Sequence, residues 1–163
     1  MPAELISVRL CTAEDLPALH AREAHPSARI AQRHFDLQSA GDYYYAVAFR
    51  GTTPMGTCSM DTHRHNPLCP ELMNLWVYPD SRRQGAAKAM TAFLESQAAG
   101  LGYVEVFLRV DPNNEAAIPM YIGLEYTPTG DHLVTKYETV DPAGVISSIE
   151  ETDAIYRKSL LTR

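Results

Sequence analysis

The pattern of apolar and polar positions along the chain predicts short strands that alternate with helices. Segments rich in β-branched and aromatic residues, several of them alternating between two faces, predict strands. Segments with apolar residues three or four positions apart, opened by a capping residue or closed by glycine, predict helices. The expected strands cover residues 6–10, 43–50, 55–61, 71–77, 103–110, 132–140, 145–149 and 154–161, and the expected helices cover about 12–25, 27–41, 85–101 and 114–122.

This order of elements predicts an α/β chain built around a central mixed sheet. Two helices lie near the N-terminus, with Thr12 and Ser27 as the expected N-caps. A further helix joins the strand 71–77 to the strand 103–110, and strands connected in this way run parallel with a crossover. The 163 residues suit one domain with a sizeable core, so we expect a single domain over residues 1–163.

Composition narrows the class of function. The net charge of −6 argues against nucleic acid as the main partner and mildly favours a basic substrate, such as an amine. No apolar run approaches the ~20 residues that a membrane span needs, and the N-terminus shows no signal peptide. Three cysteines without framework spacing suit reduced thiols, so we expect a cytoplasmic protein that does not act on membranes.

The stretch from Leu75 to Met90 carries the clearest chemical signal. An apolar strand ends at Pro79, a turn follows, and Gly85 with two alanines opens an amphipathic helix. Small residues allow a ligand to come close to the backbone, and the first amides of a helix lack internal partners. Arginines and a lysine add mobile positive charge at the same place. The stretch therefore predicts a cradle for a phosphate or pyrophosphate.

The spacing of this stretch, Val-x-Pro-x-x-Arg-x-x-Gly-x-Ala, resembles the acyl-CoA signature of the GNAT family, the GCN5-related N-acetyltransferases. A second segment, from Asn114 to Tyr121, resembles the GNAT motif Asn-x-x-Ala-x-x-x-Tyr. The resemblance covers roughly residues 5 to 161. It departs from the family at Leu124-Glu125-Tyr126, where members usually have Leu-Gly-Phe, and this puts the local backbone in doubt.

The resemblance implies a GNAT-like fold, with a mostly antiparallel mixed sheet and a short C-terminal helix before the last strands. It also implies an N-acetyltransferase that moves an acetyl group from acetyl-CoA to a primary amine by direct attack in a ternary complex. The family pattern assigns the oxyanion to a backbone amide, here Val77, and the departing thiolate to Tyr121. The implied cofactor-binding residues are Leu75, Trp76, Val77, Arg82, Arg83, Gln84, Gly85, Ala86, Ala87, Lys88 and Asn114.

The general base is less sharply indicated. Some family members carry a catalytic glutamate at a position comparable to Glu71, and we take Glu71 as the expected base. The alternative is a solvated glutamate at a strand end. His63 and His65 titrate in a useful range but are equally typical of surface loops.

Other interpretations stay open beside this one. The spacing of Cys58, His63, His65 and Cys69 matches no known zinc class, so we expect no metal. The competing function is a non-catalytic acyl-CoA binding or sensing module on the same fold, and a third is an interaction domain that has lost the cofactor. GNAT-like domains often pair through C-terminal strands, so a homodimer is also expected. The identity of the amine, a small molecule or a peptide, does not follow from the sequence.

Overall fold

A computed structural model describes residues 5–161 of the chain. The described residues form two compact units, and each unit is described by itself. The first contains residues 5–106 together with 160–161, and the second contains residues 107–159. The boundary falls inside one strand, β5 (Glu105–Val110). The strand order, β1-β2-β3-β4-β5-β7-β6, makes a seven-stranded sheet and confirms the predicted α/β class.

The first unit is built on four antiparallel strands. They are β1 (Ile6–Leu10), β2 (Tyr43–Arg50), β3 (Thr53–Asp61) and β4 (Glu71–Val77), and each pairs with the next. The predicted bounds of β1, β2 and β4 are confirmed. Tyr43 lies opposite Asp61, which in turn lies opposite Glu71, so these three side chains share one face of the sheet.

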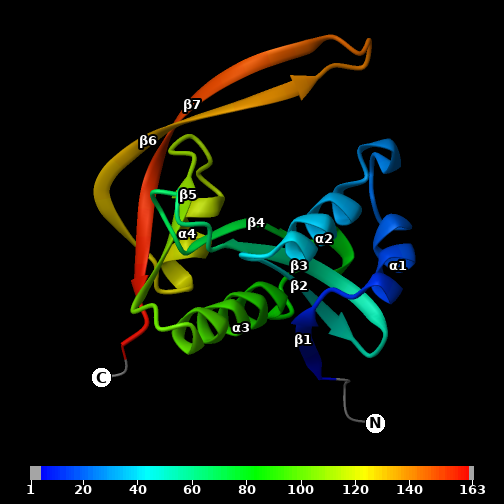
Figure 1. The fold of residues 1–163 in the computed structure, drawn as a ribbon, viewed down its shortest axis with the longest axis horizontal. Helices are drawn as coiled ribbons and strands as arrows, with labels where there is room; N and C mark the ends of the chain where they lie inside the picture. The colour runs from blue at the N-terminus through cyan, green and yellow to red at the C-terminus, as the bar shows by residue number, and fades with distance from the viewer. Residues whose placement is uncertain (1–4, 162–163) are drawn as a thin grey trace. The chain divides into compact units, whose positions relative to one another are not determined.

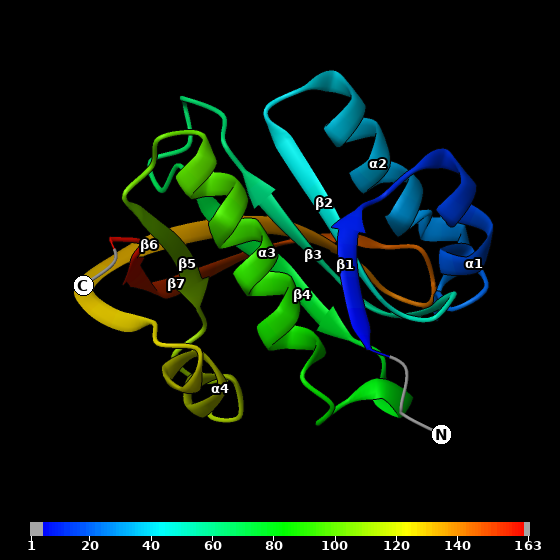
Figure 2. The ribbon, with the colours of Figure 1, turned by 90° about the horizontal axis from the view of Figure 1, so that it is seen from below.

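Helices cover both faces of these strands. The helices α1 (Leu16–His20) and α2 (Ile30–Ala40) lie on one face, and α3 (Ala86–Gly100) lies on the other, as Figures 1 and 2 show. Alternation along β2 explains this arrangement, because successive side chains point to opposite faces. The core cluster on the α1–α2 side consists of Cys11, Leu16, Leu19, Ala31, Tyr45, Val47 and Phe49.

The N-terminal helices differ from the prediction in two ways. Instead of continuing to residue 25, α1 ends at His20. Ser27 does not cap α2, because it lies within a short 3₁₀ turn, and the N-cap is Arg29 in a left-handed conformation with φ 50°. The carboxylate of Glu23 accepts a hydrogen bond from the Ala31 amide at 2.7 Å. Glu23, eight positions before Ala31, therefore accepts the hydrogen bond that an N-cap side chain normally accepts at the start of a helix.

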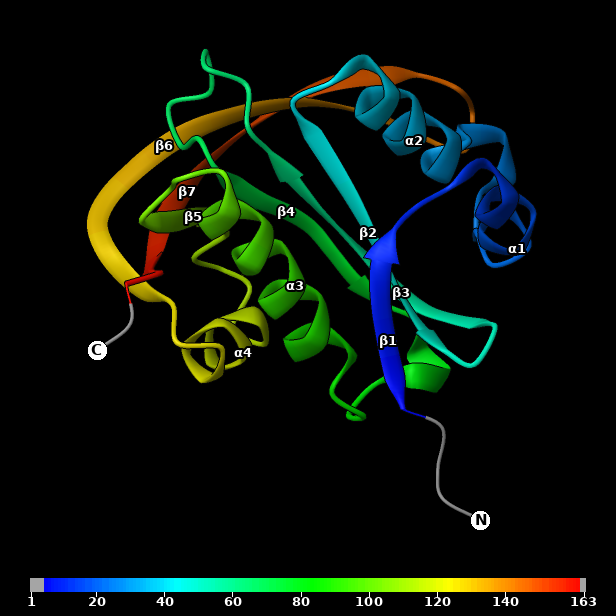
Figure 3. The same ribbon diagram turned by 60° about the horizontal axis from the view of Figure 1, so that its bottom comes forward.

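The second unit contains the rest of β5, the helix α4 (Ala117–Gly123) and a long hairpin. The hairpin strands are β6 (Thr127–Val140) and β7 (Ile146–Ser159), joined by the predicted turn at residues 141–144 (Figure 3). The prediction of two separate strands, 145–149 and 154–161, is wrong. The structure has one strand, because residues 150–153, which lie between the two predicted strands, pair with residues 133–136 of β6.

The backbone after α4 shows how the chain accommodates Leu124-Glu125-Tyr126 in place of the family's Leu-Gly-Phe. Glu125 adopts φ 73°, the left-handed conformation that favours glycine at a helix C-terminus. The amide of Tyr126 then donates to the Tyr121 carbonyl at 3.0 Å and closes the helix. The backbone that a glycine would favour therefore forms here with a glutamate, at a cost in conformational strain.

This strain predicts that Glu125→Gly stabilises the protein. A left-handed non-glycine residue costs about 1–2 kcal/mol, part of which the greater freedom of glycine in the unfolded chain offsets. We expect the free energy of unfolding in urea to rise by about 0.5–1 kcal/mol. Glu125→Ala is the matched control, because it also removes the carboxylate but keeps a Cβ. Equal stabilities of the two variants would contradict a strained backbone at this position.

Candidate functional site

The strand β4 leaves the regular ladder before it reaches the predicted cradle. Its register with β3 shifts between Thr57 and Ser59, because β4 carries one extra residue, and Asn74 takes a left-handed φ of 55°. A bulge of this kind redirects the strand and is over-represented beside active sites. Beyond it, Gly56 lies opposite Val77, and a Cβ built on Gly56 would sit 2.4 Å from the carbonyl oxygen of Trp76. Only glycine permits this close approach of the two backbones.

The same geometry sets the direction of the Val77 amide. The amide of Tyr78 donates to the Met55 carbonyl of β3 at 2.9 Å. Successive amides of an extended strand point in opposite directions, so the Val77 N–H is directed away from β3. An amide in this position suits the role that the family pattern gives to Val77.

The turn between β4 and α3 presents backbone amides to solvent. A 3₁₀ turn at Pro79–Ser81 is followed by left-handed residues at Arg83, with φ 62°, and Gly85, with φ 93°. Left-handed residues in a turn create a concave nest of N–H groups that binds anions. Among the described residues, the backbone hydrogen bonds of loops and turns use no amide between residues 82 and 86 as a donor. The first amides of the fifteen-residue helix α3 join this nest.

The sequence predicted mobile positive charge at the turn, but one of the cationic side chains is held in place. Arg82 lies over the ring of Trp76, 4.8 Å from its centroid, and donates to the Val77 carbonyl at 3.0 Å. Arg83 and Lys88 are exposed. Trp76 is 51% exposed, so Arg82 and Trp76 form a flat, open surface beside the cradle.

These residues fit the nucleotide end of a coenzyme A thioester. Gly85 lacks a Cβ where the nest opens, and a Cβ there would have only the Ile6 methyl within 4 Å, at 3.9 Å. The space in front of the amides is therefore left open by the neighbouring side chains. Pyrophosphate oxygens accept hydrogen bonds from such amides, and the positive helix end and the exposed cations favour their charge.

Comparison with known proteins decides the family. A family model described as the acetyltransferase (GNAT) family matches residues 9–124, which is more than half of the chain. The protein belongs to the GNAT family. No curated protein matches the chain.

Solved structures share the GNAT fold over nearly the whole chain. An N-acetyltransferase from Staphylococcus aureus Mu50 is 20% identical with a TM-score of 0.68, covering 96% of this chain and 99% of its own. The ribosomal-protein-S18-alanine N-acetyltransferase of Escherichia coli is 19% identical with a TM-score of 0.68, covering 98% and 96%. A Salmonella typhimurium protein solved with acetyl-CoA is 16% identical with a TM-score of 0.66, again covering 98% and 96%.

Glu71, the expected general base, is buried rather than solvated. It is 3% exposed, and its Oε1 accepts a hydrogen bond from the Asn66 side-chain amide at 3.0 Å. The same amide donates to Asp61 Oδ2 at 2.9 Å, and Asn66 Oδ1 accepts from the Leu68 amide at 2.8 Å. The alternative of a solvated glutamate is therefore wrong. Asn66 fixes two neighbouring carboxylates on the sheet face that α1 and α2 cover.

His63 joins this network through Asp61. Its Nδ1 lies 2.5 Å from Asp61 Oδ1, and its backbone amide donates to the same oxygen at 3.0 Å. Burial acts to raise the pKa of Asp61, but the hydrogen bonds from His63 and Asn66 outweigh it, so that this pKa is lower than usual. The aspartate is thus held ionised beside the imidazole.

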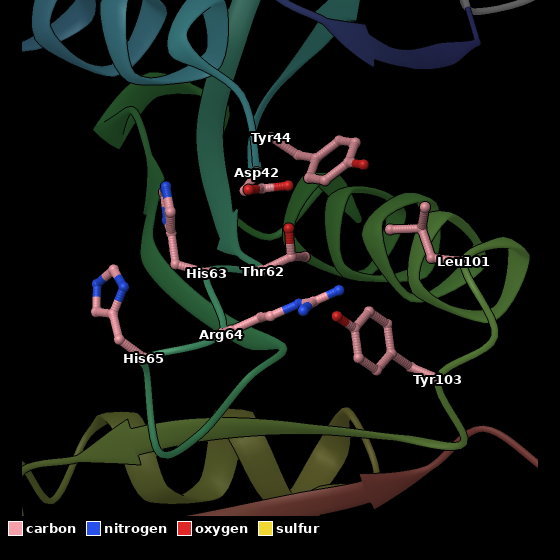
Figure 4. Close-up of a pocket in the computed structure, with 8 residues that line it drawn as sticks. All are labelled: Asp42, Tyr44, Thr62, His63, Arg64, His65, Leu101 and Tyr103. Atoms are coloured by element: carbon pink, nitrogen blue, oxygen red, sulfur yellow. The ribbon is translucent and has the colours of Figure 1, made fainter.

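The two loop histidines line a cavity of about 550 Å³ at the other end of α3 (Figure 4). A fifteen-residue helix is about 22 Å long, so this cavity is well separated from the cradle at its N-terminus. His63 and His65 therefore do not flank the turn between β4 and α3. The residues lining the cavity are Asp42, Tyr44, Thr62, His63, Arg64, His65, Leu101 and Tyr103.

Tyr121 and Asn114 belong to the second unit. Tyr121 lies in α4, and Asn114 precedes it, with Oδ1 accepting a hydrogen bond from the Ala117 amide at 3.2 Å. Asn114 therefore helps to start α4, as an Asx turn does. Their roles toward the cofactor stay predictions from the family motif.

The residues considered for zinc are separated by their environments. Cys58 is fully buried in β3, and its thiol faces the carbonyl oxygens of Ser59 and Met73. Cys69 lies 3.3 Å from the Tyr103 hydroxyl. In residues 5–161, no group of three or more histidine, cysteine, aspartate or glutamate side chains is arranged to hold a metal. Within that range, too, no helix is long and apolar enough to cross a membrane.

Three important residues were not among those that the sequence pattern singled out. Gly56 stands inside a strand pattern, and an isolated glycine there often marks a close backbone approach, so this signal was present. Asn74 carries no comparable signal, although asparagine tolerates the left-handed conformation better than most residues. The third, Arg22, connects the segment after α1 to the turn between β4 and α3 through an ion pair with Asp80 at 2.6 Å, and it lies over the Tyr78 ring.

The close approach at Gly56 predicts that Gly56→Ala is destabilising. Its Cβ would meet the Trp76 carbonyl at 2.4 Å and the Val77 Cα at 3.0 Å, so β4 must move. We expect the free energy of unfolding to fall by about 1–3 kcal/mol in a urea titration. Gly100→Ala is the control, since a Cβ at that position would have nothing within 4 Å and the change favours the helix. Equal effects of the two changes would show that the strands are not held this closely.

The cradle predicts that Gly85→Glu weakens coenzyme A binding at least tenfold, about 1.4 kcal/mol. The side chain adds bulk and a like charge in front of the amides. Gly102→Glu is the matched control, because its φ of 96° imposes similar strain at the other end of α3. Calorimetry on both folded variants measures the affinity. An unchanged affinity in Gly85→Glu would remove this turn from the cofactor site.

Proposed function

We propose that this protein is an N-acetyltransferase that moves the acetyl group of acetyl-CoA to a primary amine in a ternary complex. The observation that carries the proposal is the turn between β4 and α3. Its exposed amides suit pyrophosphate, and just before the turn the Val77 amide is directed away from β3, toward a position for a carbonyl oxygen. Binding and activation of a thioester would thus share one continuous segment.

The chemistry asks for three further roles. The C–N bond forms as the C–S bond breaks, so the amine must lose protons and the thiolate must gain one. We assign Glu71 as a general base, because it lies on the face covered by α1 and α2, where Asn66 fixes its orientation. We assign Tyr121 as the donor to the thiolate and Asn114 as a contact to the pantetheine arm, both from the family motif.

The acceptor is a small-molecule or peptide amine in this proposal. Two proteins of the same fold act on such groups: a spermidine N-acetyltransferase from Vibrio cholerae, solved with coenzyme A and spermine, and the E. coli S18-alanine enzyme. The net charge of −6 favours a cationic acceptor. We further propose one catalytic domain over residues 1–163, a cytoplasmic location, no metal in the reaction, and a homodimer through the β6–β7 hairpin.

A thiol-release assay over a broad amine panel tests the function. Release of free coenzyme A that depends on one class of amine is the expected result. Tight acetyl-CoA binding without transfer to any amine would instead indicate an acyl-CoA sensor on the same fold.

The role of Tyr121 predicts that Tyr121→Phe lowers kcat by about 10²-fold, the low end for general acid catalysis, because water replaces the donor in part. The change keeps the ring, so coenzyme A affinity should stay the same. Steady-state transfer and calorimetry on parent and variant separate the two effects. An undiminished kcat would exclude Tyr121 from the mechanism.

A further inference from the structure

A histidine on α2 points its imidazole at hydroxyl groups of the sheet beneath it. His34 Nδ1 lies 2.7 Å from the Tyr43 hydroxyl and 3.4 Å from the Ser59 hydroxyl. Its ring stacks on Tyr45 with centroids 4.9 Å apart, and on Tyr43 at 5.9 Å. With the ring proton on Nε2, the Tyr43 hydroxyl donates to Nδ1, and the Ser59 hydroxyl, which also bonds the Tyr43 side chain, lies beside them. The imidazole is therefore held in one orientation by two neighbouring strands.

This cluster reaches the bulge of β4. The Tyr43 hydroxyl also interacts with the side chain of Asn74, the left-handed bulge residue. Tyr43 faces the same side of the sheet as Glu71, because both are register partners of Asp61. A chain of polar groups thus runs from the bulge, through a phenol, to an imidazole on the face that α1 and α2 cover.

The His34 imidazole is neutral and can therefore accept a proton. Burial lowers the pKa of His34, so the ring is neutral at pH 7. The titratable groups that face it are Tyr43 and Tyr45 of β2, with Asp61 of β3 beside Tyr43. Burial raises the pKa of both tyrosines, so neither is a phenolate at this pH. The His34 side chain is only partly buried, so water reaches it.

We propose that Tyr43 and His34 form a proton relay for the acceptor amine, with His34 as the base that acts through Tyr43. The inference rests on the proposed acetyl transfer. An ammonium acceptor loses two protons, one before attack and one as the C–N bond forms, while the departing thiolate takes up one. Glu71 serves the first loss. In the second, the amine proton moves to Tyr43 Oη as the phenol proton moves to His34 Nδ1.

This division of labour follows from the strengths of the bases. The proton lost as the C–N bond forms is far more acidic than that of a free ammonium ion, so a neutral imidazole of lowered basicity accepts it readily. The imidazolium then releases a proton to water from its partly exposed edge, and exchange with solvent restores the starting tautomer. The phenol is re-formed in the same step, so Tyr43 never carries a full negative charge.

The test compares His34→Gln, His34→Ala and Tyr43→Phe with the parent protein. His25→Gln is the control, because His25 is an exposed histidine that lies before α2. In the parent, kcat/KM should fall as the pH drops through the pKa of His34, because the protonated ring cannot accept. That limb should be lost in His34→Gln, with kcat/KM reduced about 10²-fold at pH 7.5 and acetyl-CoA affinity unchanged. Added imidazole should restore part of the turnover of His34→Ala but none of Tyr43→Phe.

The possible outcomes separate the relay from the transfer itself. A His34→Gln variant with the parent's pH profile, or a His34→Ala variant that imidazole does not rescue, would overturn the relay and leave the acetyltransferase standing. A parent that transfers acetyl to no amine would overturn both. As a measurement independent of turnover, the His34 ring should titrate by NMR below the ordinary ~6.5, and a higher value would also overturn the proposal.

Discussion

The structure of the site depends on one close approach, that of β3 to β4 at Gly56. The two backbones come so near that a single Cβ would collide with the Trp76 carbonyl. This approach follows directly after the bulge at Asn74, where β4 gains a residue and changes direction. Together they fix which amides of β4 pair with β3, and so leave the Val77 amide directed away from it. The position of the proposed oxyanion donor is therefore a consequence of sheet geometry.

The turn between β4 and α3 is tied back to the same unit by two arginines, of which the family motif includes only Arg82. Arg22, which follows α1, pairs with Asp80 and lies over Tyr78. Arg82 lies over Trp76 and donates to the Val77 carbonyl. Arg22 thus connects the turn to the segment after α1, and Arg82 connects it to the end of β4. These contacts link the turn to two other parts of the unit, while Arg83 and Lys88 stay exposed.

Local sequence patterns predicted the strands well, because dense β-formers and strong turn residues determine them. The bounds of β2 and β4 were predicted to the residue. Predictions of element bounds failed where a residue or strand distant in the sequence determines where a helix starts or how far a strand extends. Glu23 satisfies the start of α2 in place of Ser27, and β6 draws β7 into one continuous strand.

In the candidate site, too, features set by local sequence could be predicted, and features set by distant contacts could not. The strand, turn and helix start that form the candidate cradle were predictable, because a proline ends the strand and a glycine followed by alanines opens the helix. The burial of Glu71 was not, because it depends on Asn66 folding back from the loop to meet it. The left-handed backbone at Glu125 was in doubt for the opposite reason, since the chain accepts a strained residue where the local rule calls for glycine. The pairing of His34 with Tyr43 joins a helix to a strand and leaves no trace in either local pattern.

The central claim is that one segment, from Val77 to Ala87, binds both the phosphates and the acetyl group through its backbone amides. Amide ¹H–¹⁵N NMR spectra recorded during titration with coenzyme A, and separately with acetyl-CoA, test it most directly. The account predicts that both ligands shift the amides of Arg83 to Ala87, and that only acetyl-CoA moves the Val77 amide strongly downfield. Equal Val77 shifts with both ligands, or the largest shifts at the cavity around Thr62 to His65, would contradict it.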